Sequence, residues 1–348
     1  MVSLSVVESS NALVNTLHQN PVLVVFGGTS GIGRATLLEF AARTTDLSPR
    51  IHLVGRSASA ADEIRSEISK SNPSATLSFY AADCGLMREV DRVCNEILEA
   101  EKEHGINVAY LAAGTLELDR KPNEEGLPVH LALQLFGRVR AAKKLLPALG
   151  SAAKRGELAR LVFIAAGTKE GPIDEMDMSL LRTPISKIRG HLASMLTLVF
   201  AKLAREEEAK GVSFVHVFPG MVNTNILRNK RNLTEVAIHY VGSAAMKLAS
   251  WMGKTLSIKE TGERHVWLGT SAKFPPSNAV GFQGVQEDKK TEPATGVDGK
   301  AGSGAYMIDW DGSEANEGTK TLIANYIVDG MMDKVWEYFT EEFTRIGL

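Results

Sequence analysis

Short runs of apolar, largely β-branched residues recur from Pro21 onward between longer stretches with helical periodicity. Parallel strands need crossover connections, and helices are the usual crossovers. Alternating strands and helices are therefore typical of a parallel sheet covered on both faces. The expected strands are Val22–Phe26, Ile51–Val54, Thr76–Tyr80, Val108–Leu111, Leu161–Ile164 and Phe214–Phe218. We predict an α/β fold with a doubly wound parallel sheet.

Two of the intervening segments carry apolar stripes at a spacing of three to four residues, which indicates helices with one face toward a core. The stripes are Leu131, Leu135, Val139, Ala142 and Leu146 in one segment, and Ile188, Leu192, Met195, Val199 and Leu203 in the other.

The pattern divides the chain into a core and an extended C-terminal lid region. The predicted divisions are an N-terminal leader (1–20), a core (21–226), a lid helix at 233–252 with a long irregular loop (together 227–304), and a last strand at Ala305–Asp309 with C-terminal helix (305–348). A loop of this length is uncommon in a compact domain, so we expect it to be functional or locally disordered.

Composition excludes several classes of protein. Lys and Arg number 39 against 41 Asp and Glu, so there is no basic excess for nucleic acid. Cys84 and Cys94 form no CxxC pair, the histidines have no metal-ligand spacing, and no metal site is expected. No basic leader with an apolar run and no run of about 18 apolar residues is present, so we expect a cytoplasmic protein without a membrane span.

A glycine-rich turn follows the first expected strand directly. Gly27 permits a tight turn, Gly31 lets the backbone approach a pyrophosphate, and Gly33 lets the next helix pack against the strand. The free N–H groups and the dipole at that helix start favour an anion. The turn predicts a dinucleotide site.

The residue after the second expected strand suggests which dinucleotide is bound. An NAD site places a carboxylate there to accept the ribose hydroxyls, whereas this chain has Arg56, 23 residues past Gly33. Because an arginine suits a 2′-phosphate, we expect NADP.

Together, the glycine turn, its spacing to Arg56, and Pro219-Gly220-Met221-Val222-Asn223-Thr224 after the sixth strand resemble the short-chain dehydrogenase/reductase family over residues 21–224. Gly262-Glu263-Arg264-His265 and Met307–Gly312 are similar to fungal members that tailor secondary metabolites. The resemblance implies a Rossmann-type fold, an oxidoreductase and a bulky small-molecule substrate. Relatives commonly form homo-oligomers through the helices flanking the site, and the sequence leaves that state open.

Carried over residue by residue, the resemblance assigns a cofactor site. Asp83 would approach the adenine, Gly114 ends a Leu-Ala-Ala-Gly segment where the family has Asn-Asn-Ala-Gly, and Thr224 would meet the nicotinamide. The full set is Gly27, Thr29, Ser30, Gly31, Ile32, Gly33, Arg56, Asp83, Gly114, Lys187, Pro219, Gly220, Val222 and Thr224.

The catalytic positions depart from the family pattern. The family has a serine after the fifth strand, where this chain has Ala165 and Ala166, and a Tyr-x-x-x-Lys motif that falls on Thr183 and Lys187. Gln134 stands at the position of the family's asparagine. Only the lysine of four survives, and losing a positioned general acid removes roughly 10² to 10⁴ in rate.

Three interpretations follow. In the first, the protein transfers hydride to a substrate that needs no proton from the enzyme, or it uses another acid, such as Asp174, Glu175 or Asp177, as the proton donor. Alternatively, NADP is a structural or electrostatic element of a cyclisation, dehydration or isomerisation without net redox. In the third, the chain is an inactive cofactor-binding sensor or scaffold.

Other residues near these motifs are expected to be structural or solvated. His191 lies one helical turn beyond Lys187 and is expected to be a packed structural residue. Arg228, Lys230 and Arg231 form a basic run that we expect to be solvated.

Overall fold

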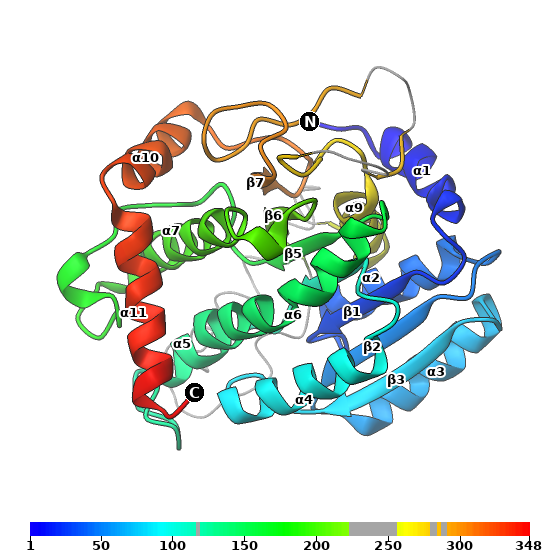
Figure 1. Cartoon of the computed structure of the whole chain (residues 1–348), viewed down its shortest axis with the longest axis horizontal. Coiled ribbons are helices and arrows are strands. Elements are labelled where there is room, and N and C mark those ends of the chain that lie inside the picture. Colours follow the sequence, from blue (N-terminus) through cyan, green and yellow to red (C-terminus); the bar gives the residue numbers. More distant parts are fainter. Residues whose placement is uncertain (116–118, 223–255, 279–283, 287–290) are drawn as a thin grey trace.

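The computed structural model describes residues 1–115, 119–222, 256–278, 284–286 and 291–348. In this part of the chain, seven parallel strands form one sheet in the order β3-β2-β1-β4-β5-β6-β7 (Figure 1). The strands are β1 (Val22–Phe26), β2 (Arg50–Gly55), β3 (Thr76–Ala81), β4 (Val108–Leu111), β5 (Arg160–Ile164), β6 (Ser213–Phe218) and β7 (Ala305–Asp309). The predicted doubly wound parallel sheet is confirmed, and each expected strand is found.

The order of the strands predicts where a ligand binds, and we call the region outside the carboxyl ends of β1 and β4 the crevice. Successive strands are added toward one edge of the sheet from β1 to β3 and toward the other edge from β4 to β7. The reversal in strand order therefore lies between β1 and β4. In open α/β sheets, ligands bind outside the carboxyl ends of the strands at such a reversal. The glycine turn follows β1, and Ala112–Gly114 follow β4, so both border this crevice.

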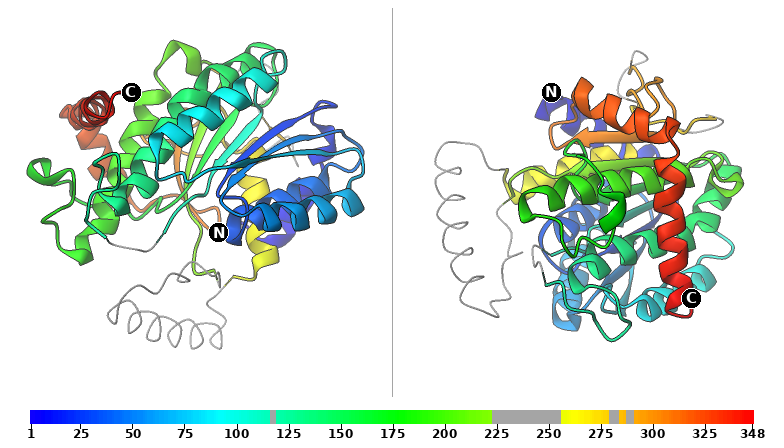
Figure 2. Two further views of the ribbon diagram at one scale, coloured as in Figure 1. Left: turned by 90° about the horizontal axis from the view of Figure 1, so that it is seen from below. Right: turned by 90° about the vertical axis from the view of Figure 1, so that its left-hand side faces the viewer.

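Helices cover both faces of the sheet, and each layer closes its own apolar core (Figure 2). One face carries α4 (Met87–Ala100), α6 (Gly137–Lys154), α7 (Ile185–Leu203), α10 (Glu317–Val328) and α11 (Met331–Arg345). The other carries α1 (Leu4–Ala12), α2 (Gly31–Arg43), α3 (Ala58–Ser71) and α9 (Ile258–Thr270). A short α5 (Val129–Leu131) and a π-helical turn (Ala132–Phe136) precede α6, and 3₁₀ turns occupy Val14–Thr16, Glu175–Asp177 and Glu207–Ala209.

Both predicted apolar stripes are core-facing. The residues at 131, 135, 139, 142 and 146 are buried, as are those at 188, 192, 195, 199 and 203. Burying an aliphatic side chain contributes about 1.5–3 kcal/mol, so these stripes fix α6 and α7 on the sheet. No helix in the described ranges is both long and apolar enough to span a membrane.

Helix α9 lies within the predicted lid region (227–304), at residues to which the sequence assigned no particular element. Ile258–Thr270 form a helix buried from Thr261 onward between α1 and α2. Gly262 permits the contact, since a Cβ there would lie 2.7 Å from the Ala35 carbonyl oxygen. Its sequence mixes glycine with charged residues, so it lacks an apolar stripe. The lid helix predicted at 233–252 lies outside the described residues.

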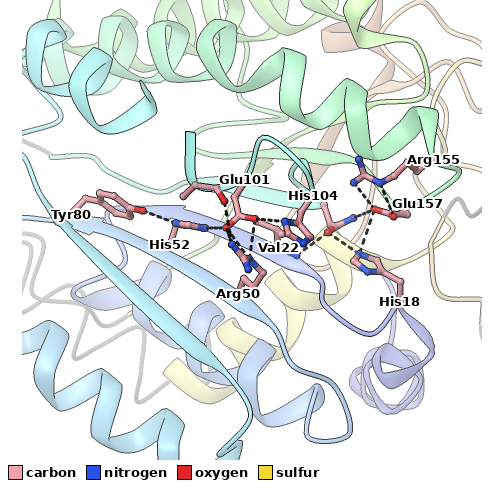
Figure 3. Close-up of polar contacts among 11 residues, drawn as sticks. His18, Val22, Arg50, His52, Tyr80, Glu101, His104, Arg155 and Glu157 are labelled. Carbon is pink, nitrogen blue, oxygen red and sulfur yellow. Dashed lines mark hydrogen bonds and ion pairs between the residues drawn. The ribbon is translucent and has the colours of Figure 1, made fainter. Parts of the chain in front are cut away.

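A buried carboxylate ties strands and a helix together at the amino edge of the sheet, opposite the crevice (Figure 3). Glu101, which follows α4, accepts hydrogen bonds from Arg50 Nε at 3.0 Å and Nη2 at 2.9 Å. Its Oε1 also lies 2.7 Å from His52 Nε2, and His52 Nδ1 lies 2.9 Å from the Tyr80 hydroxyl. Burial raises the pKa of Glu101, but hydrogen bonds from His52 and Arg50 outweigh burial and hold that pKa below its usual range.

A second polar group continues this edge toward β5 (Figure 3). Asn107 Oδ1 accepts the Val22 N–H at 2.8 Å and lies 2.9 Å from His18 Nε2. Asn107 Nδ2 donates to Glu157 Oε2 at 3.2 Å. These bonds align the starts of β1, β4 and β5, which sets the level at which their carboxyl ends meet.

Replacing Glu101 with glutamine should destabilise the fold in a pH-dependent way. The pKa of Glu101 is lower in the folded protein than in the unfolded chain, where it is ~4.3. The carboxylate therefore contributes stability at pH values above the unfolded pKa, and this contribution is lost as pH falls through the folded pKa. We expect Glu101→Gln to lose about 3 kcal/mol at pH 7 in urea unfolding, with the loss shrinking below about pH 4. Glu99→Gln, at an exposed pair with Lys102, is the control and should change little. A pH-independent loss at Glu101 would contradict this assignment.

Candidate active site

The glycine turn adopts the backbone that its sequence predicts. Gly27 has φ +81° and Gly31 has φ +57°, in the region that favours glycine. A Cβ on Gly33 would lie 2.5 Å from the Gly27 carbonyl oxygen, and one on Gly27 would lie 2.5 Å from the Ala113 nitrogen. The turn therefore fits closely between the start of α2 and the end of β4.

The N-terminus of α2 is left open by its own sequence. Ser30 is the N-cap residue, yet its side chain accepts no hydrogen bond from the helix. The N-cap side chains of α1, α3, α9 and α10, which are Ser3, Ser57, Ser257 and Asn316, all accept such a bond. Because the first N–H groups of a helix need partners from outside it, the open start of α2 suits an anionic ligand.

Three predicted cofactor residues lie along the same edge. Arg56 follows β2 and is exposed, Asp83 follows β3 and is exposed, and Gly114 follows β4. The Asp83 carboxylate also accepts the Gly85 N–H at 2.9 Å, which fixes its loop. A phosphorylated dinucleotide needs hydrogen-bond donors and positive charge. The N–H groups at the start of α2 and the guanidinium of Arg56, which has no ion pair with any described residue, supply both, so these residues fit that group.

At the family's serine position, two alanines directly follow β5, and their methyl groups cannot donate a hydrogen bond. The Ala165 N–H donates to the Val217 carbonyl at 2.9 Å, and the Ala166 N–H donates to His216 Nε2 at 3.2 Å. Neither alanine supplies the hydroxyl group that the family's serine has at this position.

A buried polar chain that the sequence analysis missed stands behind Ala166. His216 Nδ1 lies 2.9 Å from the Thr197 hydroxyl, which donates to Glu170 Oε1 at 2.7 Å. Because Ala166 donates to Nε2, the proton of a neutral His216 sits on Nδ1 and points toward Thr197. The available signal was a histidine inside the otherwise apolar run of β6.

The loop that continues from Ala166 is anchored to β7. Thr168 is held at φ 70°, an uncommon conformation for threonine, and its hydroxyl donates to Asp309 Oδ2 at 3.0 Å. Lys169 Nζ donates to the same oxygen at 2.5 Å. These bonds fix the backbone next to the alanines.

The three other predicted catalytic residues do not meet in a hydrogen-bonded group. Thr183 is buried, and its hydroxyl donates to Asp177 Oδ2 at 2.8 Å. Lys187 lies exposed in the first turn of α7, and its side chain makes no hydrogen bond or ion pair with any residue that the structure describes. Gln134 is half-buried on the π-helical turn, a feature that is frequent at functional sites.

No described tyrosine hydroxyl bonds to Lys187. Four of these hydroxyls have partners elsewhere: Tyr80 with His52, Tyr110 with the His265 carbonyl, Tyr306 with the Pro275 carbonyl, and Tyr326 with the Ile173 N–H. Tyr240 lies outside the described residues, as do Thr224, Arg228, Lys230 and Arg231.

The three acids considered as replacement proton donors all have structural partners. Asp174 accepts the Met176 N–H at 3.0 Å, and Glu175 pairs with Lys334 at 2.6 Å. Asp177 accepts from the Thr183 hydroxyl and from the N–H groups of residues 181–183. Burial raises the pKa of Asp177, but these bonds outweigh burial and hold it below its usual range, so Asp177 is a poor acid near neutral pH.

Two further predicted residues close the site on the β6 side. Gly220 has φ +78°, and a Cβ there would lie 2.9 Å from the Trp310 ring. Val222 is paired with Leu256 in an isolated parallel bridge. His191 is buried, burial lowers its pKa, and its Nδ1 lies 3.5 Å from the Asp174 N–H, as its expected packed position implies.

Thr183 should act through its hydrogen bond to Asp177. Thr183→Val removes that bond while keeping the shape, and we expect a loss of about 1–3 kcal/mol because a buried carboxylate loses one donor. Thr183→Ser keeps the hydroxyl and should lose clearly less in urea unfolding at pH 7. Equal losses for the two variants would mean that packing, and not the hydroxyl, is what Thr183 contributes.

Proteins similar to this chain in sequence or fold are named as oxidoreductases and reductases. No family model matches the chain. It is 33% identical over 341 residues to oxidoreductase AN1596 of Emericella nidulans, covering 97% of each chain. It is also 32% identical over 243 residues to the short-chain dehydrogenase/reductase SAT2 of Stachybotrys chartarum, covering 64% of this chain and 66% of that protein. In fold it is similar to NADPH-bound carbonyl reductase from chicken fatty liver, with TM-score 0.53 at 15% identity, over 86% of this chain and 99% of that one. The chain belongs to the short-chain dehydrogenase/reductase family of oxidoreductases.

Proposed function

We propose that this protein is an NADP(H)-dependent oxidoreductase that transfers hydride without the family's tyrosine and serine. The observation that carries the proposal is the contrast between the two halves of the site. The glycine turn and the uncapped start of α2 fit a dinucleotide, whereas Ala165, Ala166 and the Asp177-bound Thr183 offer no positioned proton.

In the cofactor half, backbone N–H groups and a positively charged side chain would bind the dinucleotide. The N–H groups at the start of α2 would bind the pyrophosphate, and Gly27 and Gly33 keep the turn close enough for that contact. Arg56, exposed after β2, would bind the 2′-phosphate of NADP(H). When bound, the nicotinamide supplies or accepts a hydride.

The catalytic half favours a substrate that needs no proton from the protein. Reduction of a ketone places negative charge on oxygen and requires a nearby acid. Hydride transfer to an iminium ion instead neutralises a positive charge, so this reaction needs no proton and the absence of the tyrosine does not slow it. We therefore propose an iminium or similarly activated group as the reacting centre.

The substrate is proposed to be a bulky small molecule of fungal secondary metabolism. Two relatives at about one-third identity, AN1596 and SAT2, are fungal proteins named as an oxidoreductase and a short-chain dehydrogenase/reductase. In the sequence, 39 residues separate the end of β6 at Phe218 from the start of α9 at Ile258, much more than a typical connection. A long connection that begins at the carboxyl end of β6 suits a large ligand.

Arg56 should set the choice between NADPH and NADH. Arg56→Gln removes the cation without adding a charge, and we expect NADPH affinity to fall by about tenfold or more with NADH affinity nearly unchanged. Isothermal titration calorimetry with both cofactors measures this. Arg65→Gln, at an exposed pair with Asp62 on α3, is the matched control. An equal loss for both cofactors would contradict 2′-phosphate binding by Arg56.

Isotope transfer tests the chemistry directly. NADPH carrying deuterium at either face of nicotinamide C4 is supplied with a panel of cyclic iminium and ketone compounds, and the products are analysed by mass spectrometry. We expect deuterium in the product from one of the two labelled cofactors, with iminium compounds turned over faster than the matched ketones.

Two outcomes would refute this proposed chemistry. Turnover with unlabelled product and unconsumed cofactor would indicate a cyclase, isomerase or dehydratase that holds NADP as a structural element. Tight binding without turnover of any compound would favour a cofactor-binding sensor.

A further inference from the structure

Arg138 is a buried cation with very few partners. It lies in the first turn of α6, is 6% exposed, and donates from Nε to the Ala113 carbonyl at 3.0 Å. None of its nitrogens lies within 4.0 Å of a carboxylate of the described chain. A guanidinium has several N–H donors, so one hydrogen bond leaves most of its capacity unused.

Two other arginines show how this chain treats such groups elsewhere. Arg160, also buried, donates to Ser213 Oγ and to the carbonyls of Leu268, Ser271 and Phe274. Arg140, two residues along α6 from Arg138, forms a two-point pair with Asp91, both bonds at 2.6 Å. Arg160 and Arg140 are thus satisfied by protein groups, whereas Arg138 makes a single hydrogen bond to the residues that the structure describes.

An unsatisfied buried cation costs stability. Taking a charge out of water is unfavourable unless an opposite charge or hydrogen bonds replace the water. Burial lowers the pKa of Arg138 to about 10, which reports that cost. A negatively charged ligand bound beside Arg138 would offset this cost.

The position of Arg138 identifies the ligand's location. Its one acceptor, Ala113, is the residue that the Gly27 turn approaches, and a Cβ on Gly114 would lie 2.8 Å from Arg138 Nη2. The guanidinium thus lies against the end of β4, at the reversal of strand order between β1 and β4.

The start of α6 lies close to the end of β3. A Cβ on Gly137, the residue before Arg138, would overlap the Cys84 carbonyl oxygen, and Cys84 lies three residues past the end of β3. The backbone of Arg138 is therefore on the side of the crevice where the adenosine half is proposed to lie.

We propose that Arg138 is a further cofactor-binding residue, whose buried charge attracts the phosphate groups on the adenosine side of the dinucleotide. This rests on the proposed function. Arg56 meets the 2′-phosphate from the solvent side, and Arg138 acts from beneath the crevice, where low dielectric strengthens its attraction. Phosphate groups are the favoured partner because they carry the negative charge of the dinucleotide, which a buried cation attracts.

The proposal predicts opposite effects on folding and on binding. Arg138→Met keeps the volume and removes the charge, so the unliganded protein should melt at the same or a higher temperature. The same variant should bind NADPH at least about tenfold more weakly, with a smaller loss for NADH, because NADH carries less negative charge. A purely structural arginine would instead lower the melting temperature and leave the affinity of the folded protein unchanged.

The experiment combines calorimetric titration of NADPH and NADH with thermal unfolding of the full chain. Arg138→Lys keeps a charge and should fall between the wild type and Arg138→Met, whereas Arg140→Met removes a paired cation from the same helix and should bind cofactor like the wild type. Affinity of Arg138→Met within twofold of the wild type would overturn the role of Arg138 and leave the proposed function standing. Failure of the wild type to bind either dinucleotide would refute the proposed function, and this inference with it.

Discussion

The close approach of the Gly27 turn to the backbone of Ala113 is the constraint on which the rest of the site depends. It joins the ends of β1 and β4 where the order of strands reverses, with no room for a side chain. That contact forces the chain after β1 to turn sharply into α2, which directs the open helix start toward the crevice. It also brings Gly114 against the guanidinium of Arg138. A side chain at position 27 would separate the two halves of the sheet at the point where a ligand must lie.

The two halves of the site follow different physical rules. The proposed cofactor half consists of backbone N–H groups, glycine geometry and the two arginines Arg56 and Arg138. The catalytic half of the family pattern relies on hydroxyl groups, and here Ala165, Ala166 and a Thr183 bound to Asp177 stand in their places. Retained binding with altered proton chemistry is the combination expected of an enzyme whose substrate differs from a simple carbonyl compound.

Buried charge separates architecture from ligand binding in this molecule. Glu101 and Arg160 are surrounded by partners from several elements, so they hold those elements together. Glu170 reaches Thr197 and His216 behind the end of β5, yet its second oxygen has no partner among the described residues. Arg138 has one acceptor beside the crevice. The number of hydrogen bonds that each buried charge makes is the basis on which we propose a structural role for Glu101 and Arg160 and a ligand-binding role for Arg138.

The sequence by itself determined the strands, their alternation with helices, the two apolar stripes and the glycine turn, because each depends on local periodicity or on the conformational freedom of glycine. It also placed Arg56 directly after the second strand, since the end of a strand can be predicted from sequence. Only the tertiary structure decided that α9 is buried, that Thr183 is held by Asp177, and that Arg138 has no carboxylate partner among the described residues where Arg140 has Asp91. Those properties depend on contacts between residues far apart in the chain, and no local pattern encodes whether a charge has been given its counterpart.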